Sequence, residues 1–126
     1  MLINRFEDLI AWQKARALMN EIYIITRKTN FAKDLSLSDQ IIRSSRSIMT
    51  NIAEGFGRYT FRDYKHFLTI ARGSLTETQN HLYIAFDLQY ITEDEFKSLY
   101  QMTVEDYKLI NGLIAHLKQP RPKQPL

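Results

Sequence analysis

Apolar side chains recur every three to four positions along almost the whole chain, and no strand-like alternation extends beyond a few residues. A period near 3.6 residues is typical of amphipathic helices. Residues that break helices are scarce, since the 126 residues include only 4 glycines and 3 prolines. The sequence therefore predicts an all-α protein with helices over about 5–29, 37–56, 61–88 and 93–118.

The four predicted helix starts share a polar residue followed three positions later by an acid: Asn4 with Glu7, Ser36 with Asp39, Thr60 with Asp63 and Thr92 with Glu95. The polar side chain can accept from a backbone N–H, and the acid is favoured at the positive end of a helix. We expect Gly55 and Gly57 to end the second helix in the left-handed conformation, and Pro120 to stop the last helix.

Short connections between long helices favour antiparallel neighbours, so the prediction for residues 1–118 is a single antiparallel up-down-up-down four-helix bundle. Residues 119–126 are expected to form a flexible, basic, proline-rich tail. The predicted core stripe of the first helix comprises Trp12, Ala15, Met19, Ile22 and Tyr23. That of the last helix comprises Phe96, Leu99, Tyr100, Thr103, Tyr107, Ile110, Ile114 and Leu117.

Two helices carry apolar residues on a second side as well. Behind its core stripe the first has Phe6, Ile10, Ala17 and Ile24, and the third has His66, Ile70, Gly73, Glu77, His81, Ile84 and Leu88. In so small a bundle, a second apolar side requires another chain. We therefore predict a ring-like homo-oligomer with contacts at Phe6, Ile10, Ile24, Ile70, Gly73, Ile84 and Leu88, where Gly73 permits a close backbone approach. The alternative is a monomer with scattered surface hydrophobic residues.

A polar row follows one flank of the second helix: Gln40, Ser44, Ser47, Asn51 and Glu54. Buried polar side chains require hydrogen-bond partners, so the row indicates a seam between helices or between subunits. The alternative is a recognition or catalytic surface. We also predict that Arg43 pairs with Glu54 or Glu77, because a charge removed from water needs a partner.

The segments QIIRSSRSIMTNIAEGFGR (40–58) and FLTIARGSLTETQNHL (67–82) resemble the 23S rRNA intervening-sequence protein family of bacterial four-helix bundles. The matching motif residues are Gln40, Arg43, Ser47, Asn51, Glu54, Gly55, Gly73, Ser74 and Glu77. The chain departs from the family at Met49, where many relatives have proline, and at Gln89, where many have glycine.

The resemblance implies a ring-like homopentamer, because known relatives form such rings, and it assigns no chemical role to the motif residues. It also connects the chain, distantly, to the accessory variability determinant of diversity-generating retroelements. That protein is a basic pentamer that associates with a reverse transcriptase and nucleic acid. The resemblance therefore implies that RNA, DNA or a nucleic-acid enzyme are possible partners of this chain.

The net charge of +3 permits an acidic partner without requiring one. Residues 43–72 carry six basic side chains against Glu54 and Asp63. Our candidates for contact with phosphates are Arg46, Arg58, Arg62, Lys65 and Arg72. The competing interpretation is a solvated face that is partly neutralised by the nearby acids.

Several chemistries lack the residues they need. The chain has no cysteine, so thiolate catalysis, disulfides and cysteine-bound zinc are excluded. Asp63-x-x-His66 is the nearest approach to a di-iron motif and has no second copy, and the three histidines lack metal-ligand spacing. We therefore predict a cytoplasmic protein with no enzymatic activity, no metal, no cofactor, no small-molecule substrate and no membrane association.

Two functions remain open from the sequence. The first is a nucleic-acid or ribonucleoprotein accessory module that binds phosphate backbones weakly and without sequence specificity. The second is a protein–protein scaffold whose arginines form ion pairs between subunits. A steep decrease of affinity with salt would distinguish phosphate binding from scaffolding.

Overall fold

The structure is a computed structural model that describes residues 3–117. Its elements are η1 (Phe6–Asp8), α1 (Ile10–Thr26), α2 (Thr29–Lys33), α3 (Leu35–Phe56), α4 (Phe61–Asp87) and α5 (Glu93–His116). η1 is a 3-10 turn, and no strand occurs within residues 3–117. The all-α prediction is confirmed, whereas the predicted tail, 119–126, lies outside the described residues.

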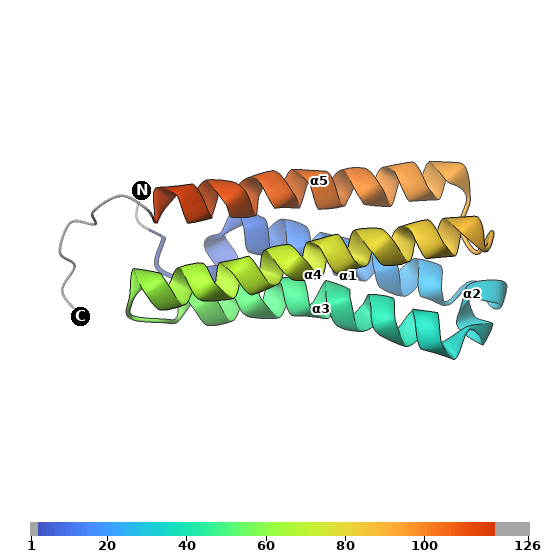
Figure 1. Cartoon of the computed structure of the whole chain (residues 1–126), viewed down its shortest axis with the longest axis horizontal. Coiled ribbons are helices and arrows are strands. Elements are labelled where there is room, and N and C mark those ends of the chain that lie inside the picture. Colours follow the sequence, from blue (N-terminus) through green and yellow to red (C-terminus); the bar gives the residue numbers. More distant parts are fainter. Residues whose placement is uncertain (1–2, 118–126) are drawn as a thin grey trace.

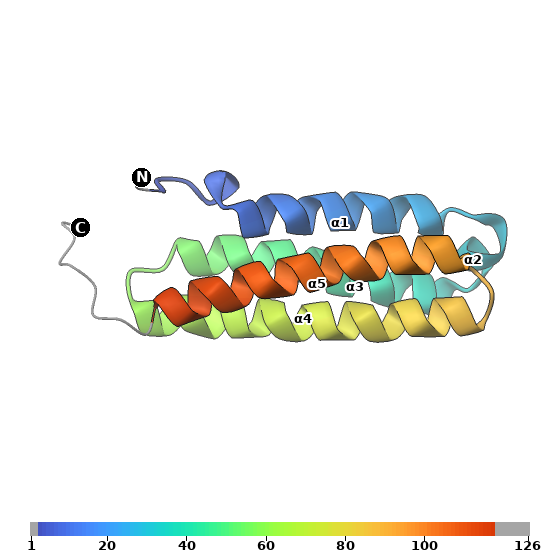
Figure 2. The same cartoon turned by 90° about the horizontal axis from the view of Figure 1, so that it is seen from above.

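The four long helices lie side by side along one axis, and the short α2 lies at one end of the molecule (Figure 1). α3 packs against α1 and α4, and α5 packs against α4 and α1. Seen from above, α1 and α4 lie on opposite sides with α3 and α5 between them (Figure 2). α1 and α4 therefore occupy opposite corners of the bundle.

Two side-chain hydrogen bonds show the relative direction of α4 and α5. Arg72 in α4 donates to Asn111 in α5, at 2.9 Å. Gln79, further along α4, donates to Thr103, which lies earlier in α5, also at 2.9 Å. Rising residue numbers in one helix thus meet falling numbers in the other.

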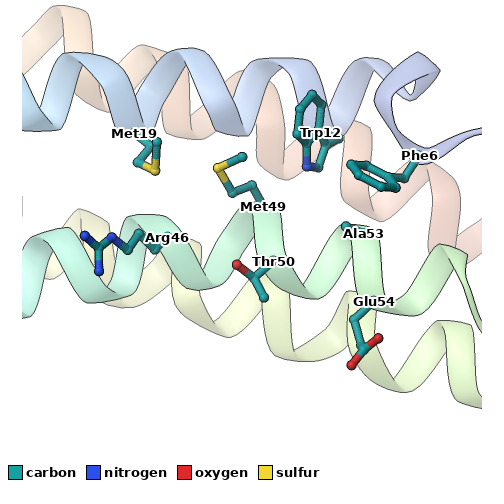
Figure 3. A pocket seen from close by; sticks show the side chains of 8 residues that line it. All are labelled: Phe6, Trp12, Met19, Arg46, Met49, Thr50, Ala53 and Glu54. Atoms are coloured by element: carbon teal, nitrogen blue, oxygen red, sulfur yellow. The ribbon is translucent and has the colours of Figure 1, made fainter.

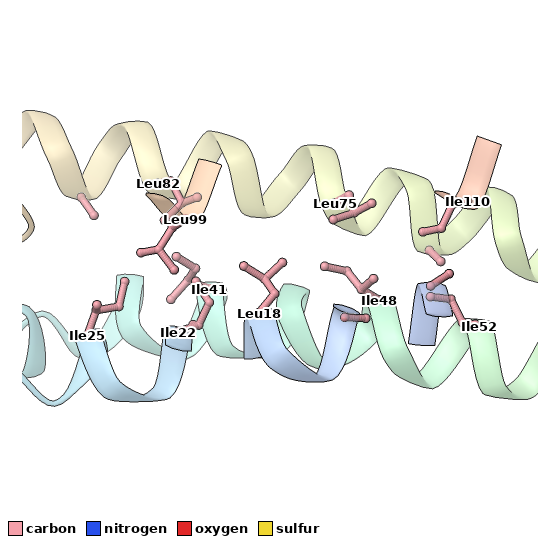
Figure 4. Close-up of a cluster of buried hydrophobic side chains, with 14 of the residues drawn as sticks. Leu18, Ile22, Ile25, Ile41, Ile48, Ile52, Leu75, Leu82, Leu99 and Ile110 are labelled. Carbon is pink, nitrogen blue, oxygen red and sulfur yellow. The ribbon is translucent and has the colours of Figure 1, made fainter. Parts of the chain in front are cut away.

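Aliphatic side chains fill the space between the helices along the length of the bundle (Figure 4). The largest fully buried hydrophobic side chains are Leu18, Ile22, Phe31, Ile41, Ile48, Ile52, Leu68, Leu75, Leu82 and Ile110. Complete burial of one such side chain contributes roughly 1.5–3 kcal/mol. The short α2 supplies Phe31, whose ring centroid lies 5.4 Å from that of Tyr90.

The first predicted helix, 5–29, is divided into η1 and α1, and α2 lies almost entirely in the connection predicted after it. Leu9 has an extended backbone, with φ −72° and ψ 124°, and separates η1 from α1. Asn4 therefore does not cap α1, and Leu9 occupies that position without a side-chain hydrogen bond. The next cap also differs from the prediction, since the side chain of Asp34, two residues before Ser36, accepts from the backbone N–H of Leu37 at 3.0 Å.

The two later helix starts agree with the sequence. Thr60 accepts from the backbone N–H of Asp63 at 3.1 Å. Thr92 accepts from the N–H of Glu95 at 3.1 Å, while the Glu95 carboxylate accepts from the N–H of Thr92 at 2.8 Å. Both predicted caps are confirmed, and the second is a reciprocal capping box.

The buried face of α1 is rotated from the predicted one. Ala15 and Ile22 are buried as expected, but Trp12, Met19 and Tyr23 are only half-buried. The remaining buried residues of α1 are Ala11, Leu18, Ile25 and Thr26. The difference arises because α1 packs against two neighbours, α3 and α5, so its buried face points between them.

Helix ends do not use the predicted left-handed glycines. Gly55 lies inside α3, and Gly57, which ends it, has φ −76°. The described residue with positive φ is Gln89, at 62°, directly after the end of α4. There the Tyr90 N–H reaches the carbonyl of Ala85 at 2.9 Å and the Gln89 N–H that of Phe86 at 2.9 Å, which is the Schellman pattern.

Candidate assembly and nucleic-acid surfaces

Five polar residues form a hydrogen-bonded seam between α3 and α4, which we call the α3–α4 seam. The hydroxyls of Ser44 and Thr78 lie 2.8 Å apart. The Ser74 hydroxyl donates to that of Ser47 at 2.8 Å, and Asn51 Nδ2 donates to the same Ser47 oxygen at 2.9 Å. The seam satisfies hydroxyls that packing removes from water. The interpretation of this polar row as a seam between helices is correct for Ser44 and Ser47, which bond to α4, whereas Asn51 supports the seam by donating to Ser47 of its own helix.

The other motif residues of α3 lie outside the seam. Gln40 donates to a hydroxyl one turn earlier in its own helix, at 3.2 Å. Arg43 Nε lies 3.6 Å from the Asp39 carboxylate, so the pairing predicted with Glu54 or Glu77 is wrong within the chain. Both Arg43 and Asp39 are exposed, and such an ion pair contributes little to stability.

Close backbone approach occurs at Gly55, not at Gly73. A Cβ atom built on Gly55 would lie 2.9 Å from the Cβ of Phe67 and 3.1 Å from the carbonyl oxygen of Tyr64. α3 and α4 therefore approach each other closely because residue 55 has no side chain. At Gly73 an added Cβ would meet nothing within 4 Å of the chain, so only a neighbouring molecule could need that space.

Two members of the predicted outer rows are not on the outer surface. Phe6 is half-buried, with its ring centroid 5.2 Å from that of Trp12. His81 is 5% exposed. Its Nε2 lies 3.2 Å from the Glu77 carboxylate, and its Nδ1 has no hydrogen-bond partner among the described residues.

A buried carboxylate that sequence reasoning missed lies on α5. Asp106 is fully buried, and neither carboxylate oxygen has a hydrogen-bond partner within residues 3–117. Burial raises the pKa of Asp106 to about 7, and the positive charge of Lys14 acts in the opposite direction. The spacing of the sequence could have indicated this burial, because position 106 falls in the same helical series as the buried residues Leu99, Thr103, Ile110 and Ile114.

Exposed aliphatic side chains occupy the outer faces of α1 and α4. On α1, Ile10 is 58% and Ile24 57% exposed. On α4, Ile70, Ile84 and Leu88 are 38%, 37% and 51% exposed. Because α1 and α4 lie at opposite corners, these residues form two separate outer rows on opposite sides of the bundle.

The five candidate phosphate contacts do not form one patch. Arg46 donates to the hydroxyl of Tyr23 in α1 and stacks over its ring. Arg72 donates to Asn111 in α5, on the opposite side of the bundle. Both cations are thus engaged inside the chain and point to different neighbours.

The remaining three candidates lie together where α3 turns into α4. Arg58 lies 4.7 Å from the centroid of the Phe67 ring and 3.6 Å from the Glu54 carboxylate. Arg62 and Lys65, in the first turns of α4, are exposed, and their side chains make no contact with an acid within residues 3–117. We call these three residues, with the 84% exposed Tyr59, the basic corner. Sequence reasoning missed Tyr59, although an aromatic residue between arginines is typical of nucleic-acid surfaces.

A groove of about 670 Å³ runs between α1 and α3 (Figure 3). Phe6, Trp12, Met19 and Met49 supply most of its apolar lining. Arg46 and Glu54 lie toward its two ends (Figure 3). Trp12 and Met19, which the sequence predicts for the core of the first helix, therefore face this groove.

Residues 3–117 contain no group of three His, Asp or Glu side chains placed to hold a metal ion. Over the same residues, no helix has both the length and the apolar character needed to cross a membrane.

Known sequences and structures resemble this chain over most of its length. A sequence model of the 23S rRNA-intervening sequence protein family matches residues 7–112. A crystal structure of a protein with unknown function from the S23 ribosomal protein family of Bacteroides thetaiotaomicron is similar, with a TM-score of 0.78 and 27% identity. The match covers 83% of this chain and 98% of that one. No curated protein matches this chain.

The family match spans the α3–α4 seam, Gly55, the basic corner and both outer rows. The resemblance read from the two motif segments is thereby confirmed. This chain belongs to the 23S rRNA-intervening sequence protein family.

Proposed function

We propose that copies of this up-down-up-down four-helix bundle associate into a ring-like homo-oligomer of five subunits that acts as a non-catalytic assembly module. The observation that carries the proposal is the pair of outer rows on opposite corners. The number five is taken from the pentameric rings of the family.

A closed ring is built from heterologous contacts, in which one face of a subunit meets a different face of the next. The outer row of α1 and the outer row of α4 supply two such faces. Gly73 lies between Ile70 and Ile84 in α4 and leaves open space at the surface, which suits a neighbouring helix. Burial of these five aliphatic side chains would remove exposed apolar surface from water.

Light scattering tests the assembly, with an expected mass of several times 14.9 kDa. Gly73→Leu should lower that mass while helical content stays unchanged, because the chain itself leaves room for a side chain there. Gly112→Leu is the matched control, since that mid-helix glycine is equally open but lies on α5. A monomeric wild-type protein, or an unchanged mass in Gly73→Leu, would contradict the proposed interface.

The basic corner is our candidate for weak binding to RNA or DNA without sequence specificity. Arg62 and Lys65 are exposed beside the N-terminus of α4, where the helix dipole also favours an anion. Glu54 and Asp63 lie nearby and limit the local positive charge. A ring would repeat the corner in every subunit, and simultaneous contacts would then strengthen a weak individual interaction.

Titration of labelled single- and double-stranded RNA at several salt concentrations tests this function. Arg62→Ala combined with Lys65→Ala should weaken binding and lower the salt dependence of binding to single-stranded RNA by about 0.7 in log–log slope for each phosphate that is no longer neutralised. Lys33→Ala with Lys108→Ala removes the same charge elsewhere and should preserve that slope. Absence of binding by the wild-type protein at about 50 mM salt would contradict nucleic-acid binding.

The second candidate function is a protein–protein scaffold. The contacts that engage Arg46, Arg58 and Arg72 within the chain make these three arginines less available to phosphates, which favours a scaffold. The ion pairs between subunits that the sequence suggests for the arginines would then have to come from other cations, such as Arg62 or Lys65. Normal assembly without RNA or DNA binding would support the scaffold.

A further inference from the structure

The two outer rows share one spacing, although they lie on different helices. Exposed residues at intervals of seven are Ile10, Ala17 and Ile24 on α1, and Ile70, Glu77 and Ile84 on α4. A strict seven-residue interval is typical of helices that pack along their length as in a coiled coil. The two rows lie on opposite sides of one chain, so each can be covered in this way by a neighbouring copy.

We propose that the outer row of α1 in one subunit packs in parallel against the outer row of α4 in the next, with each residue of the α1 row facing the α4 residue sixty positions later. Ile10 then faces Ile70, and Ile24 faces Ile84. This inference rests on the proposed ring and specifies the contact between its subunits.

α1 and α4 run in the same direction (Figure 1). Lys14 of α1 lies 4.0 Å from Glu105 of α5, and Lys28, just after α1, pairs with Glu95, which lies earlier in α5. α1 is therefore antiparallel to α5, as α4 is. Rotation about an axis along the bundle leaves the direction of every helix unchanged. In a ring with such an axis, α1 of one subunit and α4 of the next are parallel.

Helix α5 also shows which residues of α1 and α4 are level along the bundle. In the hydrogen bonds from Arg72 and Gln79 to α5, the numbers of the two bonded residues add up to 183 and 182. The α5 partners of Lys28 and Lys14 are therefore level with α4 residues 87–88 and 77–78. Residues of α1 are thus level with α4 residues 59 to 64 positions later, and rotation about the ring axis preserves that level. The offset of sixty lies within this range.

The neighbouring registers, one heptad away, pair unlike residues. With an offset of 67, Ile10 would face Glu77, and Ile24 would lie beyond the end of α4 at Asp87. With an offset of 53, Ile10 would face Asp63 and Ile24 would face Glu77. Both registers place isoleucines against carboxylates. The offset of sixty instead places both isoleucines of α1 against isoleucines of α4, which removes apolar surface from water.

Polar residues between the isoleucines also match in this register. Asn20 faces Asn80, and both are exposed. A pair of asparagines inside a coiled-coil contact specifies the register at some cost in stability. Gln13 faces Gly73, where an added Cβ would meet nothing within 4 Å of its own chain. The long glutamine side chain can therefore lie across a residue that has none.

The charges on the two rows are complementary. Arg27, at the end of α1, faces Asp87, the last residue of α4. Both are exposed, and no ion pair of Asp87 is formed within residues 3–117. Ala17 faces Glu77, and the exposed Arg16 directly precedes Ala17, so a cation also lies beside that carboxylate. Basic residues of one subunit thus meet acidic residues of the next, which favours this pairing of faces.

Disulfide cross-linking tests the register, because the chain has no cysteine. Asn20→Cys combined with Asn80→Cys should link neighbouring subunits on mild oxidation and give a ladder of covalent oligomers on a denaturing gel without reductant. Gln13→Cys combined with Asn80→Cys is the matched control. It is out of register by one heptad, or about 10 Å along the helix, which a disulfide cannot bridge. Equal linkage of the two pairs, or linkage of the control pair alone, would overturn the proposal.

Light scattering before oxidation distinguishes failure of the register from failure of the ring. An assembled Asn20→Cys, Asn80→Cys variant that forms no ladder would overturn the register and leave the ring in place. A monomeric wild-type protein would contradict the ring and the register together.

A charge exchange provides a second test that leaves both asparagines in place. Arg27→Asp and Asp87→Arg each bring like charges together, so each alone should raise the concentration at which the assembly dissociates several-fold. The variant with both changes restores opposite charges and should return that concentration toward the wild-type value. Additive effects of the two changes would show that these residues are not in contact and would overturn the register.

Discussion

The Ser74 hydroxyl of α4 donates a hydrogen bond of 2.8 Å to the Ser47 hydroxyl of α3. The two residues belong to the two separate motif segments of the family, and the fold brings them together across the α3–α4 seam. Ser47 also accepts from Asn51 at 2.9 Å, so one hydroxyl serves two donors.

Ser47→Ala should destabilise the protein by about 1–3 kcal/mol, because it leaves the Ser74 hydroxyl without its acceptor and deprives Asn51 of one of two. The free energy of unfolding from urea denaturation measures the effect. Ser98→Ala, on the exposed surface of α5, is the control and should change it by less than about 0.5 kcal/mol. Equal effects of the two substitutions would show that the seam contributes no more than a surface hydroxyl.

Gly55→Ala should also destabilise the protein, by about 1–3 kcal/mol, since the new methyl group would push Phe67 and the Tyr64 backbone away from α3. Gly112→Ala places its methyl group in open space and should raise stability by up to about 1 kcal/mol through helix propensity. Thermal unfolding of both variants measures the difference. If both substitutions stabilise the protein, there is room for a side chain at residue 55, and the inference that α3 and α4 approach each other closely at this position is wrong.

Gln89→Gly should stabilise the protein by about 1 kcal/mol. Gln89 has a φ of 62°, which strains a residue with a side chain and is easy for glycine. The gain is reduced by the larger entropy of glycine in the unfolded chain. Gln101→Gly, in the exposed interior of α5, should instead destabilise by about 1 kcal/mol, and denaturant midpoints compare the two.

Asp106 should make stability depend on pH. Its pKa is about 7 in the folded protein and near 4 in the unfolded chain, so the folded state holds the proton more tightly. The stabilising effect of that proton is complete below about pH 4 and is lost as the pH rises through 7. Asp106→Asn should therefore raise the free energy of unfolding more at pH 8 than at pH 5.

The control for Asp106 is Glu105→Gln, which removes the neighbouring half-exposed carboxylate. Unfolding free energies are measured between pH 4 and 8 for wild type and both variants. Parallel curves for wild type and Asp106→Asn would show that residue 106 keeps an ordinary pKa.

Much of the candidate site could be predicted from local pattern alone. The spacing of Ser44, Ser47 and Asn51 places them on one flank of a helix, and burial then requires partners. Their partners on α4 could not be predicted, because the choice among many polar residues depends on how two helices meet. The partner of Arg43 was predicted wrongly because the prediction assumed that its charge is buried. Arg43 is exposed and pairs with Asp39, four residues earlier in the same helix, and not with an acid more distant in the sequence.

Local sequence is sufficient to specify the helical class, the extent of α4 and α5 to within a residue or two, and the caps at Thr60 and Thr92. These features depend on periodicity and on hydrogen bonds between residues three positions apart, both of which are local. The direction in which α1 faces the core, the burial of Asp106 and the close approach at Gly55 follow instead from the packing of whole helices. Each of them depends on the position of a neighbouring helix, and residues distant in the sequence set that position.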